Sequence, residues 1–301
     1  MKKFLALLLC IPLVLLTGCT AKQSPDKKII AVSFYPVYIF TLNIVDGIDE
    51  LSVECMAEQN TGCLHDYTIT AKDARLISDC SIFVINGAGM EGFIEDLYHR
   101  EADERIVDSS IGVERICSHT HEEEHSGHSH DHEENSHMWL SVDNAIKQVE
   151  NISGGIISAF PEYEEKIQKN TEDYLKTLSE LKEEIENAKA QLQGKSVVTF
   201  HDAYAYLAED LGFHILTTIE SDEGGEPSAK ELAHISEEIK EHGVKTLFIE
   251  PDYEGSAAEI LKNETGAEIY VLNPVISGEK EKNAYEDTMR ENIKIILKAV
   301  N

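Results

Sequence analysis

The sequence predicts an α/β protein with two lobes, each containing a central, mostly parallel sheet flanked by helices, joined by one long backbone helix. Apolar strand patterns alternate with helical patterns between residues 28 and 108, and the same alternation returns after residue 194. A long helical pattern at residues 141–193 separates these two stretches. A chain of 301 residues with 42% apolar residues is long enough to build two such lobes.

The first half contains short apolar runs such as KIIAVS and SIFVI, which are typical of buried strands. Pro36 is suited to the first turn of a helix, and Thr70 is a suitable N-cap. Strands are expected at residues 28–33, 51–55, 81–85 and 105–108, and helices at residues 36–45, 70–78 and 90–98.

The middle of the chain predicts the connecting helix. Residues 143–159 are helical in pattern, Pro161 restarts the helix, and residues 163–192 continue it. Thirty helical residues span ~45 Å, which is longer than the core of one domain. Too few heptads support a coiled coil, so the segment is interpreted as a link between lobes.

The second half repeats the architecture of the first. Gly212 and Gly243 end two of its predicted helices. Strands are expected at residues 196–200, 214–219, 245–250 and 268–272, and helices at residues 203–211, 228–242, 255–264 and 284–299.

The N-terminus predicts export. Lys2 and Lys3 precede an apolar run at residues 4–16 that is too short for a stable membrane anchor, as in a signal peptide. Leu-Thr-Gly-Cys at residues 16–19 resembles a bacterial lipobox, which implies cleavage before Cys19 and lipidation of its thiol. The alternative is an ordinary cleaved signal peptide with an incidental cysteine. The lipobox interpretation places the protein outside the cytoplasm, anchored to the bacterial cell membrane.

Residues 118–136 have no hydrophobic periodicity and consist of polar residues rich in histidine, which predicts a disordered loop. The expected organisation is a signal peptide at residues 1–18, a lipid-anchored tether at 19–27, an N-terminal lobe at 28–140 that includes this loop, a connecting helix at 141–193 and a C-terminal lobe at 194–301. A monomer is expected.

Four cysteines remain in the exported chain after Cys19: Cys55, Cys63, Cys80 and Cys117. An even number in an exported protein favours two disulfides, although four cysteines allow three pairings. We favour Cys55–Cys63 with Cys80–Cys117, and the alternative is four free thiols.

The charge balance excludes one class of partner. The chain has 56 acidic and 26 basic residues, so its surface repels nucleic acid and anionic lipid. Cations are attracted to such a surface without selectivity, and any choice of metal must come from specific ligands.

Three histidines occupy junctions of the predicted elements. His65 follows the second strand, His137 precedes the connecting helix, and His201 lies at the carboxyl end of a strand. Ligands of open α/β sheets bind at the carboxyl ends of strands, and three neutral imidazoles with one oxygen suit tetrahedral Zn²⁺. The sequence therefore predicts a Zn²⁺ site between the lobes.

Several motifs in chain order are similar to a known family. They are His65 with Ala71-Lys72-Asp73, INGAGME at residues 85–91, HMWLS at 137–141, FHDAY at 200–204, GEPS at 225–228 and FIEP at 248–251. Together they resemble the cluster A-I (cluster 9) solute-binding lipoproteins of ABC importers for zinc and manganese. The resemblance covers nearly all of the chain after the tether and implies two α/β lobes, one long helix and delivery of metal to a membrane permease.

The resemblance also implies the zinc type. His201 stands where manganese members usually have a carboxylate, and nitrogen donors favour Zn²⁺ over Mn²⁺. Zinc members often carry a His-rich acidic loop before the third ligand, here with His119, His121, His125, His128, His130 and His132. This loop is interpreted as a low-affinity zinc collector or sensor, and the alternative is a solvated spacer.

The fourth ligand departs from the family pattern, which supplies Asp or Glu before the last helix. Asn273 or Ile276 stands at the expected places, and Glu279 is close but displaced. The fourth ligand is therefore expected to be Glu279, water or the carbonyl oxygen of Asn273, while Asp66 could orient His65.

The function predicted from these observations is that of a high-affinity zinc receptor, which is not an enzyme. The alternatives are a manganese or iron receptor of the same family, a zinc-dependent hydrolase and an adhesin lipoprotein. A hydrolase needs an open coordination position and a general base, for which Glu250 or Asp202 could serve.

Overall fold

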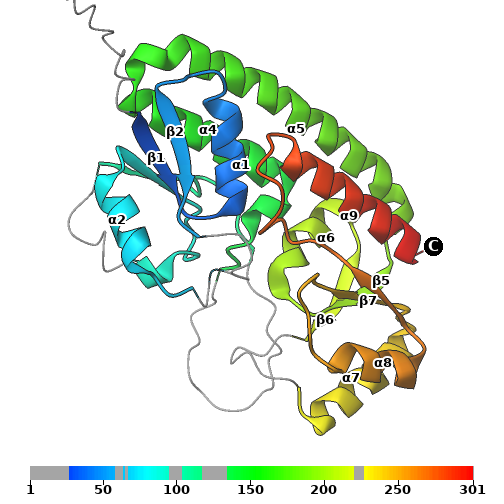
Figure 1. Cartoon of the computed structure of the whole chain (residues 1–301). Helices are drawn as coiled ribbons and strands as arrows, with labels where there is room; N and C mark the ends of the chain where they lie inside the picture. The colour runs from blue at the N-terminus through cyan, green and yellow to red at the C-terminus, as the bar shows by residue number, and fades with distance from the viewer. Residues whose placement is uncertain are drawn as a thin grey trace, which may run out of the picture.

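The computed structural model describes residues 27–57, 64, 67–94, 104–116, 134–219 and 227–300. They form two α/β lobes joined by a long helix (Figure 1), which confirms the predicted fold class. No helix within these ranges is long and apolar enough to cross a membrane. The predicted signal peptide, Cys19 of the predicted lipobox and all six loop histidines lie outside the described residues.

The first lobe contains a four-stranded parallel sheet in the order β2-β1-β3-β4. Its two central strands are almost entirely buried, which is why they appear in the sequence as continuous apolar runs. The strands are β1 (Lys28–Val32), β2 (Leu51–Cys55), β3 (Ile82–Ile85) and β4 (Ile106–Asp108), all close to the predicted ranges.

Two helices of this lobe begin as predicted. Helix α1 (Tyr35–Ile44) has Pro36 in its first turn, and α2 (Ala71–Asp79) begins with a capping box between Thr70 and Asp73. The helix predicted at residues 90–98 is wrong in its described part, which is a short 3₁₀ turn, η2 (Gly92–Ile94). Here the Glu91 side chain folds back onto the preceding backbone and favours a tight turn.

The connector consists of α4 (Val142–Ala159), a 3₁₀ turn at Pro161–Tyr163 and α5 (Glu164–Leu192). Helix α4 covers the first sheet, whereas α5 passes α1 in the first lobe and α6 and α9 in the second. The long helix α5 thus spans both lobes (Figure 1).

The second lobe repeats the topology with a parallel sheet in the order β6-β5-β7-β8. Helix α9 returns to lie along α5 (Figure 1). The strands are β5 (Ser196–Thr199), β6 (His214–Thr218), β7 (Thr246–Ile249) and β8 (Glu268–Val271), and the helices are α6 (Ala205–Leu211), α7 (Ala229–His242), α8 (Ala257–Thr265) and α9 (Ala284–Val300).

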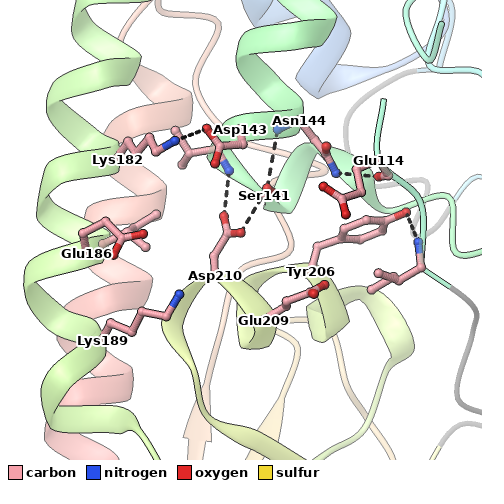
Figure 2. A pocket seen from close by; sticks show the side chains of 13 residues that line it. Glu114, Ser141, Asp143, Asn144, Lys182, Glu186, Lys189, Tyr206, Glu209 and Asp210 are labelled. Carbon is pink, nitrogen blue, oxygen red and sulfur yellow. Dashed lines mark hydrogen bonds and ion pairs between the residues drawn. The ribbon is translucent and has the colours of Figure 1, made fainter. Parts of the chain in front are cut away.

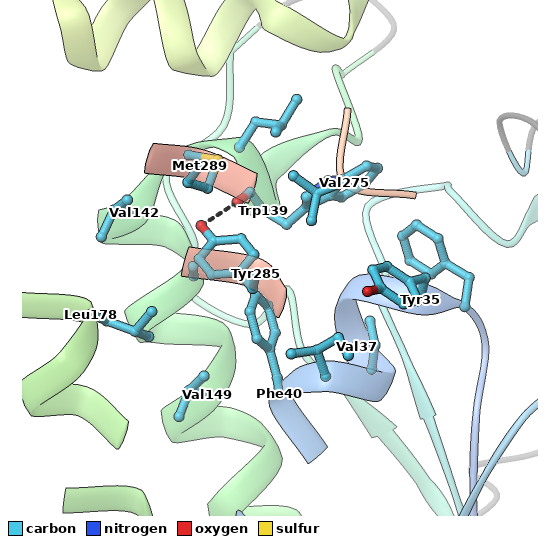
Figure 3. Close-up of a cluster of buried hydrophobic side chains, with 14 of the residues drawn as sticks. Tyr35, Val37, Phe40, Trp139, Val142, Val149, Leu178, Val275, Tyr285 and Met289 are labelled. Carbon is cyan, nitrogen blue, oxygen red and sulfur yellow. Dashed lines mark hydrogen bonds between the residues drawn. The ribbon is translucent and has the colours of Figure 1, made fainter. Parts of the chain in front are cut away.

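One hydrophobic cluster extends through both lobes and the connector. Trp139 is fully buried in it and packs edge-on against Phe34, with ring centroids 5.0 Å apart. Its indole N–H donates to the carbonyl of Pro274 (2.8 Å), and its own carbonyl accepts from the Tyr285 hydroxyl (2.7 Å; Figure 3). The lobes are therefore packed against each other around this residue.

Of the four cysteines in the predicted disulfides, the structure describes Cys55 and Cys80. Cys55 carries a thiol that lies 3.1 Å from the carbonyl of Ala57, and burial raises its pKa to about 12. Cys80 is buried at the end of α2. Because Cys63 and Cys117 lie outside the described residues, both pairings stay predictions.

Candidate metal centre

Two of the three predicted histidine ligands meet between the lobes. His137 precedes a 3₁₀ turn, η3 (Met138–Leu140), in the first lobe, and His201 caps another, η5 (Asp202–Tyr204), in the second. Their ring centroids are 4.9 Å apart, with an interplanar angle of 85°. Both side chains are buried, with exposed fractions of 4% and 8%.

This spacing fits a shared metal ion. Two imidazoles bound to tetrahedral Zn²⁺, with Zn–N distances of about 2.1 Å, have ring centres about 5 Å apart. The histidines therefore already have the separation that joint coordination requires, although they come from positions 64 residues apart in the chain.

The topology of the second sheet explains the position of His201. It follows β5, and Glu250 follows the adjacent strand β7. The order β6-β5-β7-β8 reverses between β5 and β7, and the carboxyl ends of strands at such a point are where open α/β sheets bind ligands.

Glu250 also lies beside the imidazole. Its Oε1 is 3.2 Å from Nδ1 of His201, and the backbone N–H of Ala203 donates to the same nitrogen (3.2 Å). The cap and the neighbouring carboxylate together restrain the position of the ring at the end of β5.

His137 is positioned by the end of the first sheet. Asn86 follows β3, and its Nδ2 donates to the carbonyl of Ser136 (3.0 Å). From α4, Gln148 donates to Oδ1 of Asn86 (3.0 Å) and thereby orients the amide. The ring of Trp139 lies 5.2 Å from that of His137 and forms one wall of the site.

Beneath this arrangement lies Glu91, whose side chain is 2% exposed. Its carboxylate accepts from the backbone N–H groups of Asn86 (2.7 Å) and Gly87 (3.0 Å). Burial raises its pKa to about 7, against the smaller opposite effect of these hydrogen bonds.

Replacing Glu91 by glutamine is expected to change the pH dependence of stability. Between pH 4.5 and about 7 the folded protein keeps a proton that the unfolded chain has lost, so the free energy of unfolding falls as pH rises. The free energy of unfolding of the wild type, measured relative to that of Glu91→Gln, should therefore fall by on the order of 3 kcal/mol as the pH rises across this window. Urea unfolding of the metal-free proteins would measure it, and a difference that is constant with pH would contradict the assignment.

A second link between the lobes lies beside α5. A cavity of about 190 Å³ is bordered by α5, α6 and the start of α4 (Figure 2). At its edge, Asp210 of α6 accepts from the N–H of Val142 (3.0 Å) and the hydroxyl of Ser141 (3.2 Å). Burial raises the pKa of Asp210 to about 6, and these hydrogen bonds partly offset the effect. The carboxylate thus caps α4 from the other lobe.

Of the remaining predicted ligands, the structure describes Glu279 but not His65. His65 lies outside the described residues, although its neighbour Leu64 is buried in the cluster that contains Trp139. Glu279 is exposed, and its backbone carbonyl accepts from the hydroxyl of Tyr35 (2.5 Å). Among the described residues, no three His, Cys, Asp or Glu side chains form a metal site, so both ligands stay predictions.

The other suggested oxygen ligand, Asn273, is engaged within its own lobe. Its side-chain oxygen accepts from the N–H of Val275 (2.8 Å), and its carbonyl accepts from Asn292 (2.7 Å). These contacts hold both oxygens in the segment before α9, which makes coordination by Asn273 less favourable than coordination by water.

Two residues that contact the histidines are not among the ligands predicted from the sequence. Asn135 contacts His137, with its Oδ1 3.0 Å from Nδ1, and Glu250, expected from the sequence only as a possible hydrolytic base, lies 3.2 Å from Nδ1 of His201. The position of Glu250 at the end of a predicted strand was an available signal, because His201 also follows a predicted strand and the carboxyl ends of parallel strands share one edge of a sheet. Asn135 gave no signal, since it lies in a segment predicted to be disordered.

Comparisons with known proteins agree with this architecture. A family model described as ZnuA, zinc-uptake complex component A periplasmic, matches residues 30–299. The Zn(II)-bound structure of AdcA from Streptococcus pneumoniae is similar with a TM-score of 0.75 at 29% identity, covering 91% of this chain and 58% of that chain.

Two curated relatives are similar along most of the chain. The high-affinity zinc uptake system protein ZnuA of Bacillus subtilis (strain 168) is 31% identical over 290 residues, covering 92% of this chain and 89% of that protein. The zinc-binding lipoprotein AdcA of Streptococcus pneumoniae (strain R6) is 30% identical over 310 residues, covering 98% of this chain. The chain spans 57–60% of the length of the streptococcal relatives. With the family model matching nearly the whole chain beyond residue 29, the protein belongs to the ZnuA family of zinc-uptake complex components.

Proposed function

We propose that this protein captures Zn²⁺ between its lobes outside the cytoplasm and delivers it to the permease of an ABC importer. The observation that carries the proposal is the pair His137 and His201, buried and 4.9 Å apart across the two lobes. Membership of the ZnuA family and the names of its zinc-binding relatives support the same conclusion. No bond is made or broken in this function, so the site needs only to bind, shield and release the ion.

His65 is proposed as the third ligand, and Glu279 or water as the fourth. Three nitrogen donors favour Zn²⁺ over Mn²⁺ and Fe²⁺, which lie lower in the order of affinities for such sites. Water in the fourth position would leave the ion open to exchange, which suits a protein that must release its cargo.

The N-terminal sequence and the name of one relative support a location at the cell membrane. Lipidation of Cys19 would hold the protein at the outer face of the cell membrane, and the pneumococcal relative is named a lipoprotein. In this proposal the protein acts as a monomer with lobes at residues 28–140 and 194–301, and the His-rich loop collects zinc at low affinity.

Metal competition tests the proposal. The chain from residue 20 onward, stripped of metal, should bind one Zn²⁺ tightly and prefer it to Mn²⁺ by at least about 100-fold. Titration against a zinc chelator, followed by the fluorescence of Trp139, the one tryptophan of the chain, would measure both constants. Equal affinities would favour a manganese receptor, and the absence of a saturable site would overturn the proposal.

Delivery needs a separate test in cells. A bacterium that lacks its own receptor of this family should regain growth in zinc-depleted medium when it expresses this protein with a matching permease. A variant lacking both His137 and His201 should not restore growth. Equal rescue by that variant would exclude delivery through this site.

A further inference from the structure

Asn135 has a partner for each of its hydrogen-bonding groups, although it lies in a loop. It is 1% exposed. Its N–H donates to the carbonyl of Ile116 (2.9 Å), and its carbonyl accepts from the hydroxyl of Tyr206 (2.7 Å) in the second lobe. The side-chain amide contacts His137 on one side and Asp202 on the other.

The contacts to Asp202 fix the orientation of that amide. Nδ2 of Asn135 lies 2.9 Å from the backbone carbonyl of Asp202 and 2.8 Å from its Oδ2. Both are acceptors, so the amide nitrogen must face them, and a flipped amide would place two oxygens against its own oxygen. Oδ1 of Asn135 therefore faces His137.

This orientation determines which nitrogen of His137 carries the proton. Oδ1 accepts from the backbone N–H of His137 (2.9 Å) and lies 3.0 Å from Nδ1 of its ring. An amide oxygen only accepts, so a neutral imidazole in this position has its proton on Nδ1. Nε2 then has the free lone pair that a metal ion requires.

The same amide joins the two halves of the centre. Asp202 directly follows His201, so one side chain in the first lobe contacts both the ring of His137 and the residue next to His201. Tyr206 adds a second link to the same segment, and its oxygen accepts from the N–H of Ile116 (3.3 Å).

We propose that Asn135 is a positioning residue of the metal centre, which sets the tautomer of His137 and fixes its separation from His201 across the lobe boundary. The proposal rests on the proposed function, because it assigns the residue a role in zinc capture. It also implies a route to release. Moving the lobes apart would break the hydrogen bonds to Asp202 and free the amide to rotate. The same movement would separate the two imidazoles.

The tautomer can be measured directly in the metal-free protein. Long-range ¹H–¹⁵N NMR distinguishes protonated from unprotonated ring nitrogens, and comparison with a His137→Gln variant identifies the signals of His137. We expect a proton on Nδ1 in the wild type and a mixture of tautomers in Asn135→Ala. A wild-type ring with its proton on Nε2 would overturn the proposal, whether or not zinc is the cargo.

Zinc affinity gives the second measurement. Asn135→Ala should lower the affinity by about 10- to 100-fold, the usual effect of losing a group that orients a ligand. Tyr206→Phe is the matched control: it removes both hydrogen bonds of the hydroxyl, to the carbonyl of Asn135 and from the N–H of Ile116, without touching the side-chain amide, and should lower the affinity by less than about fivefold.

A charge-conserving exchange separates positioning from folding. In the double variant Asn135→Asp, Asp202→Asn, the new carboxylate accepts from both His137 and the new amide but also meets the backbone carbonyl of residue 202, so it should recover only part of the affinity lost in Asn135→Ala. The proposal would be overturned if Asn135→Ala bound zinc like the wild type while His137→Ala did not. Failure of the wild type itself to bind zinc would instead reject the proposed function.

Discussion

Replacing His201 by alanine is expected to lower the affinity for Zn²⁺ by about two to three orders of magnitude. Tight four-ligand zinc sites are worth about 10–16 kcal/mol, so one ligand contributes about 3–4 kcal/mol. The same loss is expected for His137→Ala, because the two rings, 4.9 Å apart, are proposed to bind one ion. Since they serve a common site, the double variant should lose less than the sum of the two single effects.

The control for this experiment is His214→Ala. His214 is exposed at the start of β6, away from the carboxyl ends of the strands, and its removal should leave zinc binding unchanged. Chelator competition measures the wild type and the four variants. Wild-type affinity in His201→Ala would show that the ion is bound elsewhere, and loss in His214→Ala would point to a general effect of removing histidines.

Replacing Trp139 by alanine is expected to destabilise the whole protein. Removing a fully buried tryptophan costs about 3–5 kcal/mol. The carbonyl of Pro274 would also lose the indole donor, which adds ~1 kcal/mol or more. A total of about 5 kcal/mol corresponds to a melting temperature lower by roughly 10–20 °C for a chain of this size. Circular dichroism during heating of the metal-free protein would measure the change.

Trp139→Phe separates the contribution of the buried ring from that of the hydrogen bond to Pro274. Phenylalanine keeps most of the buried ring but cannot donate to Pro274, so it should cost about 1–3 kcal/mol. Zinc should raise the melting temperature of both variants by less than that of the wild type, because the ring also supports His137 at 5.2 Å. Equal melting temperatures for the wild type and Trp139→Ala would mean that the interface between the lobes contributes little to stability.

The sequence predicted the strands well because parallel strands covered on both faces must be apolar throughout. Strands β1, β3, β5 and β7 are central in their sheets, and each appears in the sequence as a short apolar run. Helix α5 was equally clear, since its buried residues recur at helical spacing over its whole length. The prediction of a helix at residues 90–98 is wrong in its described part, because the buried Glu91 side chain accepts hydrogen bonds from the preceding backbone and does not lie on a helix surface.

The sequence by itself determined the α/β class, the two lobes, the connecting helix and the histidines at junctions between elements, because periodicity and junction residues are local properties of the chain. Only the tertiary structure showed that His137 and His201 meet, and that Asn135 and Glu250 contact them. These contacts join residues that are distant in sequence. They depend on how the two sheets face each other, which is set by packing around Trp139 and α5 rather than by any local pattern.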